Sequence, residues 1–283
     1  MGKLIEKLHA VGQASGNGMG FFGRPRGPQR ASRPAAVFIA GTADESATLG
    51  AALENGADGV IITGWQPGTR GLAGVTAALA AREAVAGVRI EGEYREGALK
   101  AAADEGASFA ILDQRVAARA LFEEVEKFDV VATVVPPADD LGLLALRAVN
   151  LLPAQAALIQ ADFSAAGLAR LTVADFARLR LIWESVGFPS LVTVSGTLED
   201  ADVRTLVQLG ADGLLLSAAG ASAATMGQQV KALIAQLERT PAPRARPESV
   251  SLLTGLIGAQ AQEVPGPVPG PGRKPGTPEP DEE

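Results

Sequence analysis

Two short turns of small residues lie close together in the last third of the chain, where they could bind an anion. The stretch VSGTLEDADVRTLVQLGADGLLLSAAGAS, residues 194–222, holds one turn after each of two apolar runs, with a helix-like segment between them. Unpaired N–H groups at a turn or at the start of a helix can point at a phosphate. The sequence therefore indicates an anion site where these two turns meet.

A second group of residues that could do chemistry lies on predicted strands. Side chains along a strand alternate between its two faces, so in a helix-covered barrel one set faces the helices and the other faces inward. In VRIEGEY, residues 88–94, the β-branched residues would face the helices. The residues between them then face inward, and these are Arg89, Glu91 and Glu93. The same alternation predicts further inward positions that are polar: Thr63, Thr133, Gln160, Asp162, Thr193, Ser195 and Ser217.

Carboxylates at inward positions must be paired, hydrated or protonated, because burying a bare charge is costly. One interpretation is a buried polar plug formed by Arg89 and Glu91. The other is a catalytic site at the open end of the barrel, where several carboxylates lie close together and one acts as an acid or base with a raised pKa. The carboxylates of this second interpretation are Glu93, Asp162, Asp113 and Glu91. Such groups could also hold Mg²⁺ beside a substrate phosphate.

Composition excludes several other chemistries. The chain has no Cys, which excludes thiolate catalysis, disulfides and zinc–cysteine clusters. Its single histidine, His9, lies in a short amphipathic segment near the start, so a histidine triad or a histidine metal site is not expected. No Lys lies at the end of a predicted strand, which argues against a Schiff-base aldolase. A net charge of −7 argues against nucleic acid as a partner.

The elements that must position these residues alternate along the chain. Between residues 34 and 239, short apolar runs alternate with Ala-rich amphipathic segments, which is the pattern of repeated βα units. Eight such runs match the number of strands in a single (β/α)8 barrel, and a doubly wound open sheet is the alternative fold. The predicted strands span 35–41, 59–65, 88–94, 108–114, 129–135, 155–162, 189–196 and 211–218.

An internal repeat supports this α/β fold class. The segments NGADGVII, EGASFAIL and LGADGLLL each place a Gly after an Ala- or Leu-rich helix and then enter a strand. Each of these glycines, Gly56, Gly106 and Gly210, is expected to end its helix in the left-handed conformation.

The barrel is expected to span residues 35–240, with different segments on either side. Residues 1–34 form a predicted helix and a Gly/Pro/Arg-rich arm, and residues 241–283 form a linker and a disordered, acidic Pro/Gly-rich tail. A short apolar segment at 249–260 interrupts this tail, either as a docking peptide for a partner or as a helix packed on the barrel. No signal peptide or run of roughly 18 apolar residues is seen, so a cytoplasmic protein without membrane contact is expected. The sequence does not decide between a monomer and a homo-oligomer.

The stretch PSLVTVSGTLEDADVRTLVQLGADGLLLSAAGAS resembles the final third of the phosphate-binding (β/α)8 barrels. These include thiamine-phosphate synthase, the ribulose-phosphate-type enzymes and the flavin mononucleotide (FMN)-dependent oxidoreductases. In them, two turns after neighbouring strands bind phosphate. The resemblance implies that Ser195, Gly196 and Thr197 form the first phosphate turn and that Ser217, Ala218 and Gly220 form the second. Thr197 stands where a second Gly is usual.

Three functions remain open at this point. The first is a lyase or isomerase that acts on a small phosphorylated metabolite. The second is an FMN-dependent oxidoreductase that uses the same two turns. The third is a barrel that has lost catalysis and serves as a binding or scaffold module, with residues 249–260 as its docking peptide.

Overall fold

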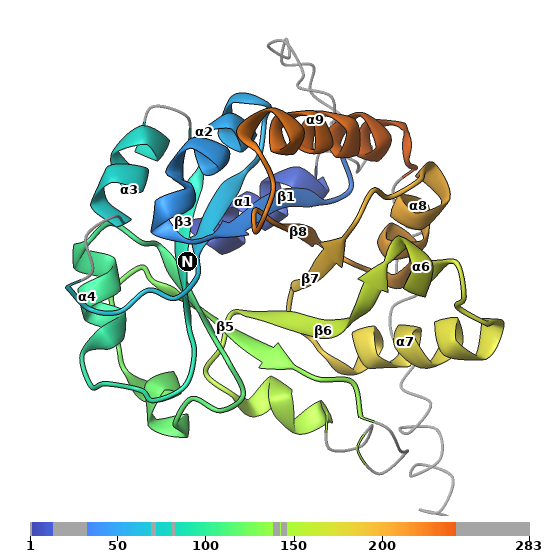
Figure 1. The fold of residues 1–283 in the computed structure, drawn as a ribbon. Helices are drawn as coiled ribbons and strands as arrows, with labels where there is room; N and C mark the ends of the chain where they lie inside the picture. The colour runs from blue at the N-terminus through green and yellow to red at the C-terminus, as the bar shows by residue number, and fades with distance from the viewer. Residues whose placement is uncertain are drawn as a thin grey trace, which may run out of the picture. The chain divides into compact units, whose positions relative to one another are not determined.

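Eight parallel strands pair in chain order and close into a barrel, as the apolar runs predict (Figure 1). The computed structural model describes residues 2–13, 33–68, 72–80, 83–137, 142 and 146–241. Within this part of the chain the first and eighth strands pair directly, from Ala36 beside Gly213 to Ala40 beside Ser217. The strands are β1 (Ala36–Gly41), β2 (Gly59–Ile62), β3 (Val85–Ile90), β4 (Phe109–Leu112), β5 (Asp129–Val134), β6 (Ala156–Ser164), β7 (Ser190–Ser195) and β8 (Gly213–Ser217).

Helices surround the barrel and bury its outer face (Figure 1). The helices are α1 (Lys3–Gln13), α2 (Ser46–Glu54), α3 (Leu72–Ala80), α4 (Ala98–Asp104), α6 (Ala165–Leu168), α7 (Val173–Ser185), α8 (Asp200–Leu209) and α9 (Ala223–Arg239). Short 3-10 helices lie at Ala43–Glu45, Ala118–Phe122 and Arg147–Leu151. The expectation that every strand is followed by an amphipathic α-helix is wrong after β4, where only the 3-10 helix Ala118–Phe122 forms.

Glu123, directly after this 3-10 helix, connects the segment to α4. Its carboxylate accepts hydrogen bonds from the Tyr94 hydroxyl and from the N–H groups of Gly97 and Lys100, at the start of α4. The segment after β4 is thereby held against the start of α4.

The predicted strands all overlap observed ones, but the third prediction is displaced. β3 begins at Val85 and ends at Ile90, whereas the sequence predicted a strand over 88–94. Gly92 has φ +74, a left-handed conformation that a strand cannot contain, so the chain turns before Glu93. Glu91 and Glu93 are therefore loop residues that follow the strand.

The barrel interior is filled by apolar side chains over most of its height. Phe38 and Phe109 meet edge to face, with ring centroids 6.3 Å apart. Gly87 leaves room for Phe109, because a Cβ at Gly87 would overlap the phenylalanine ring. The buried interior residues on the strands are Ala36, Phe38, Ile61, Val85, Phe109, Ile111, Val131, Ala156, Leu158, Leu191 and Leu215.

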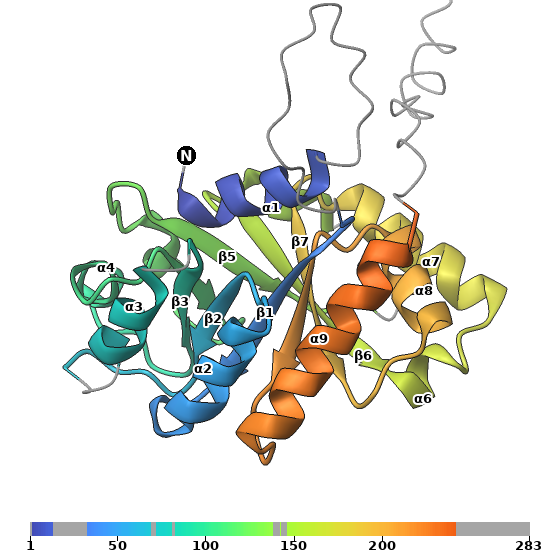
Figure 2. The same ribbon diagram turned by 90° about the horizontal axis from the view of Figure 1, so that it is seen from above.

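Helix α1 closes one end of this interior (Figure 2). Leu4, Ile5 and Leu8 pack into the same apolar cluster as the strand residues. The buried carboxylate of Asp129, at the start of β5, accepts hydrogen bonds from the N–H groups of Gly2, Leu4 and Ile5. Because Asp129 begins its strand, α1 covers the N-terminal end of the barrel and leaves the opposite end open for a site.

The repeated Gly-Ala-Asp and Gly-Ala-Ser segments have the predicted conformation. Gly56, Gly106 and Gly210 have φ values of +98, +97 and +111, which confirms that each is left-handed. The polar residue two positions later ties the next strand to its neighbour. Asp58 accepts a hydrogen bond from Val37 N–H at 2.8 Å, and Asp212 accepts one from Ser190 N–H at 2.8 Å.

Two further observations concern the predicted flanks. Residues 14–32 of the arm and residues 242–283, including the apolar segment 249–260, lie outside the described residues. Among the helices that are described, none has the length and apolarity that crossing a membrane requires.

Candidate functional site

The inward side chains change from apolar to polar near the C-terminal ends of the strands. Arg89 pairs in register with Ile111, and Thr133 with Leu158. Ile111 and Leu158 belong to the apolar interior, and in such barrels residues from alternate strands form layers across the interior. Arg89 on β3 and Thr133 on β5 therefore form part of the first polar layer, which rests on apolar side chains. By the same alternation the next inward positions are Thr63, Asp113, Gln160 and Ser217.

A cavity of about 600 Å³ lies above this polar layer. Its size is in the range of small-molecule sites, and its position at the C-terminal ends of the strands is where barrel enzymes bind their substrates. Val135 stands 46% exposed in its wall, although it directly follows a fully buried strand. The lining residues come from the ends of β3, β4, β5 and β6: Glu91, Gly92, Asp113, Gln114, Arg115, Val135 and Gln160.

Arg89 joins two of the predicted carboxylates beneath this cavity. Its Nη2 lies 3.4 Å from Asp113 Oδ2, and its Nε lies 2.9 Å from Glu91 Oε1, at an angle that does not make a hydrogen bond. The arginine and aspartate side chains are 20% and 23% exposed, so both are mostly screened from solvent. The Arg89–Glu91 contact predicted as a polar plug is thus present, but Arg89 lies beneath an open cavity and Glu91 lies at its rim.

Asp113 is the more enclosed of the two carboxylates. Its Oδ1 accepts a hydrogen bond from Arg115 N–H at 3.2 Å, and Oδ2 faces Arg89. Glu91 is 50% exposed and lies at the rim. The two acids share one guanidinium, which neutralises charge that a divalent cation would otherwise balance. Among the described residues no cluster of three metal-ligating side chains is found.

Glu93 does not join this group. It follows the left-handed Gly92, is exposed, and does not line the cavity. The prediction that it faces the interior with Glu91 assumed a strand that continues to residue 94, and the observed strand ends at Ile90.

Asp162 is also separate, because β6 is irregular before it. The pairing with β7 jumps from Ile159 beside Val192 to Phe163 beside Val194, so two extra residues interrupt the alternation. Asp162 is exposed, and its Oδ1 accepts a hydrogen bond from Ser164 N–H at 3.1 Å. The hydrogen bonds from the Ser164 side chain and backbone lower the pKa of Asp162, which favours its ionised form. It therefore stabilises its own turn, and the expected raised pKa is not found there.

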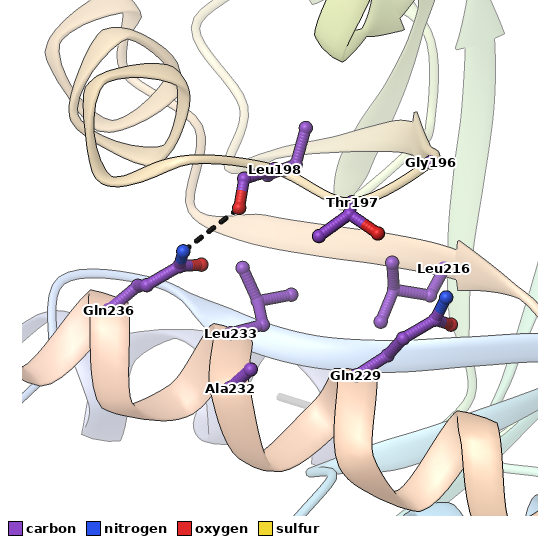
Figure 3. A pocket seen from close by; sticks show the side chains of 8 residues that line it. All are labelled: Gly196, Thr197, Leu198, Leu216, Gln229, Ala232, Leu233 and Gln236. Atoms are coloured by element: carbon purple, nitrogen blue, oxygen red, sulfur yellow. Dashed lines mark hydrogen bonds between the residues drawn. The ribbon is translucent and has the colours of Figure 1, made fainter.

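The first predicted phosphate turn lies beside α9 (Figure 3). Gly196 has φ +76 and is exposed, and Thr197 and Leu198 follow it around a cavity of about 40 Å³. Gln236 of α9 donates to Leu198 O at 2.9 Å and fixes the turn to that helix. Within the described part of the chain, Thr197 makes no hydrogen bond through its N–H or its hydroxyl, so both are available to a ligand.

In the second predicted turn, several N–H groups are already used. Ala218 donates to Ala40 O at 2.7 Å, Ala219 to Ser217 Oγ at 3.3 Å, and Ala221 to Ala218 O at 3.0 Å. Gly220, with φ +73, is exposed. This turn therefore offers an anion fewer N–H groups than its sequence suggested.

Two aromatic residues near strand ends pack into the fold. Trp65 is 6% exposed, and its Nε1 donates to Glu105 at 3.0 Å. Tyr94 is 4% exposed and donates to Glu123, and burial together with this hydrogen bond raises the pKa of the tyrosine well above its usual range. Neither ring has an exposed face on which a ligand could stack.

One residue of the cavity wall, Val135, was not predicted from the sequence. Gln160, which was predicted to face inward, also lines the wall, and Arg115, just past a predicted strand, lies at the rim. The signal for Val135 was its position two and four residues after Thr133 and Val131, which share its strand face. Because Val135 is apolar, its residue type alone does not indicate a role in a site.

Comparison with known proteins is limited to fold. No family model and no curated protein matches the chain. Among solved structures, thiamine phosphate pyrophosphorylase from Pyrococcus furiosus is 17% identical with a TM-score of 0.52, over 72% of this chain and 95% of that one. Orotidine 5'-phosphate decarboxylase from Pyrococcus horikoshii OT3 is 12% identical with a TM-score of 0.53, over 71% and 98%. A ligand-free tryptophan synthase chain from M. tuberculosis is 14% identical with a TM-score of 0.54, over 74% and 94%.

These similarities and the closed sheet define the class of protein. The chain has the (β/α)8 barrel fold, which it shares with these solved structures. At these identities the likeness extends to architecture alone.

Proposed function

We propose that this barrel is an enzyme of the lyase or isomerase type that acts on a small phosphorylated metabolite. The observation that carries the proposal is the cavity of about 600 Å³ at the C-terminal ends of β3 to β6, with Asp113 held on its floor by Arg89. An enclosed carboxylate with a fixed cation beside it can exchange a proton with a bound molecule.

Asp113 is the residue we assign as acid or base. It lines the cavity, is 23% exposed, and is oriented by Arg89 on one oxygen and by Arg115 N–H on the other. Glu91, 50% exposed at the rim, is better placed to bind a polar group of the substrate than to transfer a proton. Gln160 on the opposite wall adds a neutral donor and acceptor.

The phosphate group would bind at the turn after β7. Gly196 and Thr197 are exposed there with N–H groups not engaged by other described residues, and Gly220 follows β8 close by along the barrel edge. Two of the similar structures carry phosphate-bearing compounds in their names, thiamine phosphate and orotidine 5'-phosphate, which supports the same ligand class here.

A thermal-shift screen tests this proposal. The purified protein is heated with inorganic phosphate, FMN and a panel of sugar and heterocycle phosphates, each with and without Mg²⁺. A compound at roughly 100 times its Kd should add about 2.7 kcal/mol of stability, which is a shift of several degrees for a domain of this size. If inorganic phosphate and every phosphate ester leave the Tm unchanged, the phosphorylated-substrate proposal is wrong.

A second candidate is a barrel that binds a ligand or partner without catalysis. The observation that favours it is the second turn, where Ala218, Ala219 and Ala221 N–H groups are satisfied within the protein. In this case residues 249–260 would be a docking peptide for a partner protein. A compound that stabilises the protein but is recovered unchanged after long incubation would support this candidate.

The FMN-dependent alternative uses the same two turns and has its own test. Added FMN should raise the Tm and co-purify with its visible absorbance if the turns bind it. A protein that stays colourless in excess FMN contradicts this alternative.

A further inference from the structure

Two polar groups at the floor of the cavity are buried and make no hydrogen bond within the described part of the chain. They are Thr133 Oγ1 and Arg89 Nε. Arg89 Nε is ion-paired with Glu91 Oε1 at 2.9 Å, so the Thr133 hydroxyl is the one of the two without a polar partner. Thr133 is only 8% exposed, so its hydroxyl is withdrawn from solvent. A buried donor without a partner costs about 1 to 3 kcal/mol and is uncommon in folded proteins, so the Thr133 hydroxyl calls for an explanation.

Both groups face the same region of the barrel. Arg89 and Thr133 lie on alternate strands, and each pairs in register with an interior apolar residue, Ile111 or Leu158. Val135, two residues beyond Thr133 on the same face of the chain, lines the cavity, as does Glu91, two residues beyond Arg89. The hydroxyl and the guanidinium nitrogen therefore lie directly beneath the cavity, with the apolar interior next below them.

We propose that Thr133 and Arg89 form a binding site for one oxygen atom of the ligand, a carbonyl or carboxylate oxygen. Both groups are hydrogen-bond donors, and the guanidinium is always charged, so together they suit an oxygen with partial or full negative charge. The inference deepens the proposed function, since it concerns the end of the metabolite that enters the cavity above Asp113. It does not require the phosphate turns.

The first test measures the stability of the free protein. Thr133→Val keeps the shape of the side chain and removes the unpartnered hydroxyl, so the Tm should stay equal or rise. Thr48 supplies a matched control, because it is 7% exposed and its hydroxyl donates to Ala221 O at 3.3 Å. Thr48→Val should lower the Tm. A clear loss of stability in Thr133→Val would mean that the hydroxyl has a structural partner and would overturn the inference.

The second test uses three probes that separate the oxygen site from the phosphate turns. Pyruvate offers a carbonyl and a carboxylate without phosphate. Dihydroxyacetone phosphate and glycerol phosphate differ only in a carbonyl against a hydroxyl. The wild type should be stabilised by pyruvate and should bind the ketone phosphate more tightly than the alcohol phosphate. Thr133→Val should weaken binding of both carbonyl compounds by about tenfold, the worth of one hydrogen bond to a charged or polarised group, and Thr133→Ser should restore it.

The outcomes distinguish the two proposals. If pyruvate binds through Thr133 but neither phosphate ester binds better than pyruvate, the proposed oxygen site is supported and the proposal that the two turns bind phosphate is wrong. If both phosphate esters bind equally well and pyruvate does not bind, the proposal that the turns bind phosphate is supported and the proposed oxygen site is wrong. Unchanged affinity of Thr133→Val for the carbonyl compounds, or no binding of any probe by the wild type, also overturns the inference.

Discussion

At the scale of single residues, the surroundings of Asp113 and Asp162 separate two carboxylates that the sequence treats alike. Asp113 shares Arg89 with Glu91 and lines the cavity. Asp162 is exposed and accepts a hydrogen bond from Ser164 N–H, two residues along its own chain. Placement in the fold, rather than residue type, makes one of them suitable for proton transfer.

Asp113→Asn should therefore abolish most of the activity toward the compound that the thermal-shift screen identifies. The change keeps the size of the side chain and removes the proton acceptor, so turnover should fall by about 10²-fold or more. Stability should change by less than about 1 kcal/mol, because the lost ion pair is partly exposed. The rate of conversion, followed by NMR, measures the effect.

Asp162→Asn is the matched control for this prediction, with the same chemical change outside the cavity. Its turnover should stay close to that of the wild type. If Asp162→Asn loses activity and Asp113→Asn does not, the assignment of the acid or base is wrong.

At the scale of elements, the sequence predicts the strands well because a strand covered on both faces is a nearly continuous apolar run. The runs at β1, β2, β4, β5, β7 and β8 are of this kind. The strand predicted over 88–94 begins three residues later than β3 does, because β3 begins at Val85. Alternation predicts Arg89, Gln160 and Thr133 correctly within strands and fails where regular pairing ends, at Glu93 beyond β3 and at Asp162 beyond the irregular pairing of β6.

Packing inside the barrel gives a prediction for β3. Gly87→Ala would place a methyl group in the ring of Phe109, so it should destabilise the protein by about 1 to 3 kcal/mol. Gly50→Ala, on α2, adds the same atom where nothing lies within 4 Å and should be neutral or stabilise by up to about 1 kcal/mol. Urea unfolding measures both. Equal effects of the two changes would contradict the packing described for the interior.

The anchoring of α1 predicts a specific dependence on pH. Burial raises the pKa of Asp129, although the N–H groups of Ile5, Leu4 and Gly2 oppose the shift. The folded protein therefore holds this proton more tightly than the unfolded chain. The stability that the group contributes is fully present below its unfolded pKa of about 3.9 and is lost as the pH rises through the folded pKa. The difference in Tm between the wild type and Asp129→Asn should accordingly fall as the pH rises above about 4.

Asp175 provides a control of opposite sign. Hydrogen bonds from the Thr172 side chain and backbone, at the start of α7, lower the pKa of Asp175. Its contribution is present above the unfolded pKa and is lost as the pH falls, so the difference in Tm between the wild type and Asp175→Asn should fall toward acid. If the difference in Tm changed with pH in the same direction for Asp129→Asn and Asp175→Asn, this account of the two carboxylates would be wrong.

At the scale of the whole molecule, the barrel is complete without the last part of the chain. β1 pairs with β8, α9 ends at Arg239, and Met1–Arg244 form one compact unit. Deletion of residues 245–283 should therefore leave the Tm and the binding of small molecules unchanged. A Tm that falls by several degrees would instead indicate that residues 249–260 pack on the barrel, the alternative to a docking peptide.

The central claim is that the open end of the barrel binds a small phosphorylated molecule, with its phosphate at the turn after β7 and its other end above Asp113. The most direct measurement is a TROSY NMR titration of the isotope-labelled protein with the phosphate ester that raises its Tm most. The account predicts that the amide signals of Gly196, Thr197 and Gly220 shift together with those of Asp113 and Thr133. Shifts confined to other parts of the barrel, or no saturable shifts at all, would contradict it.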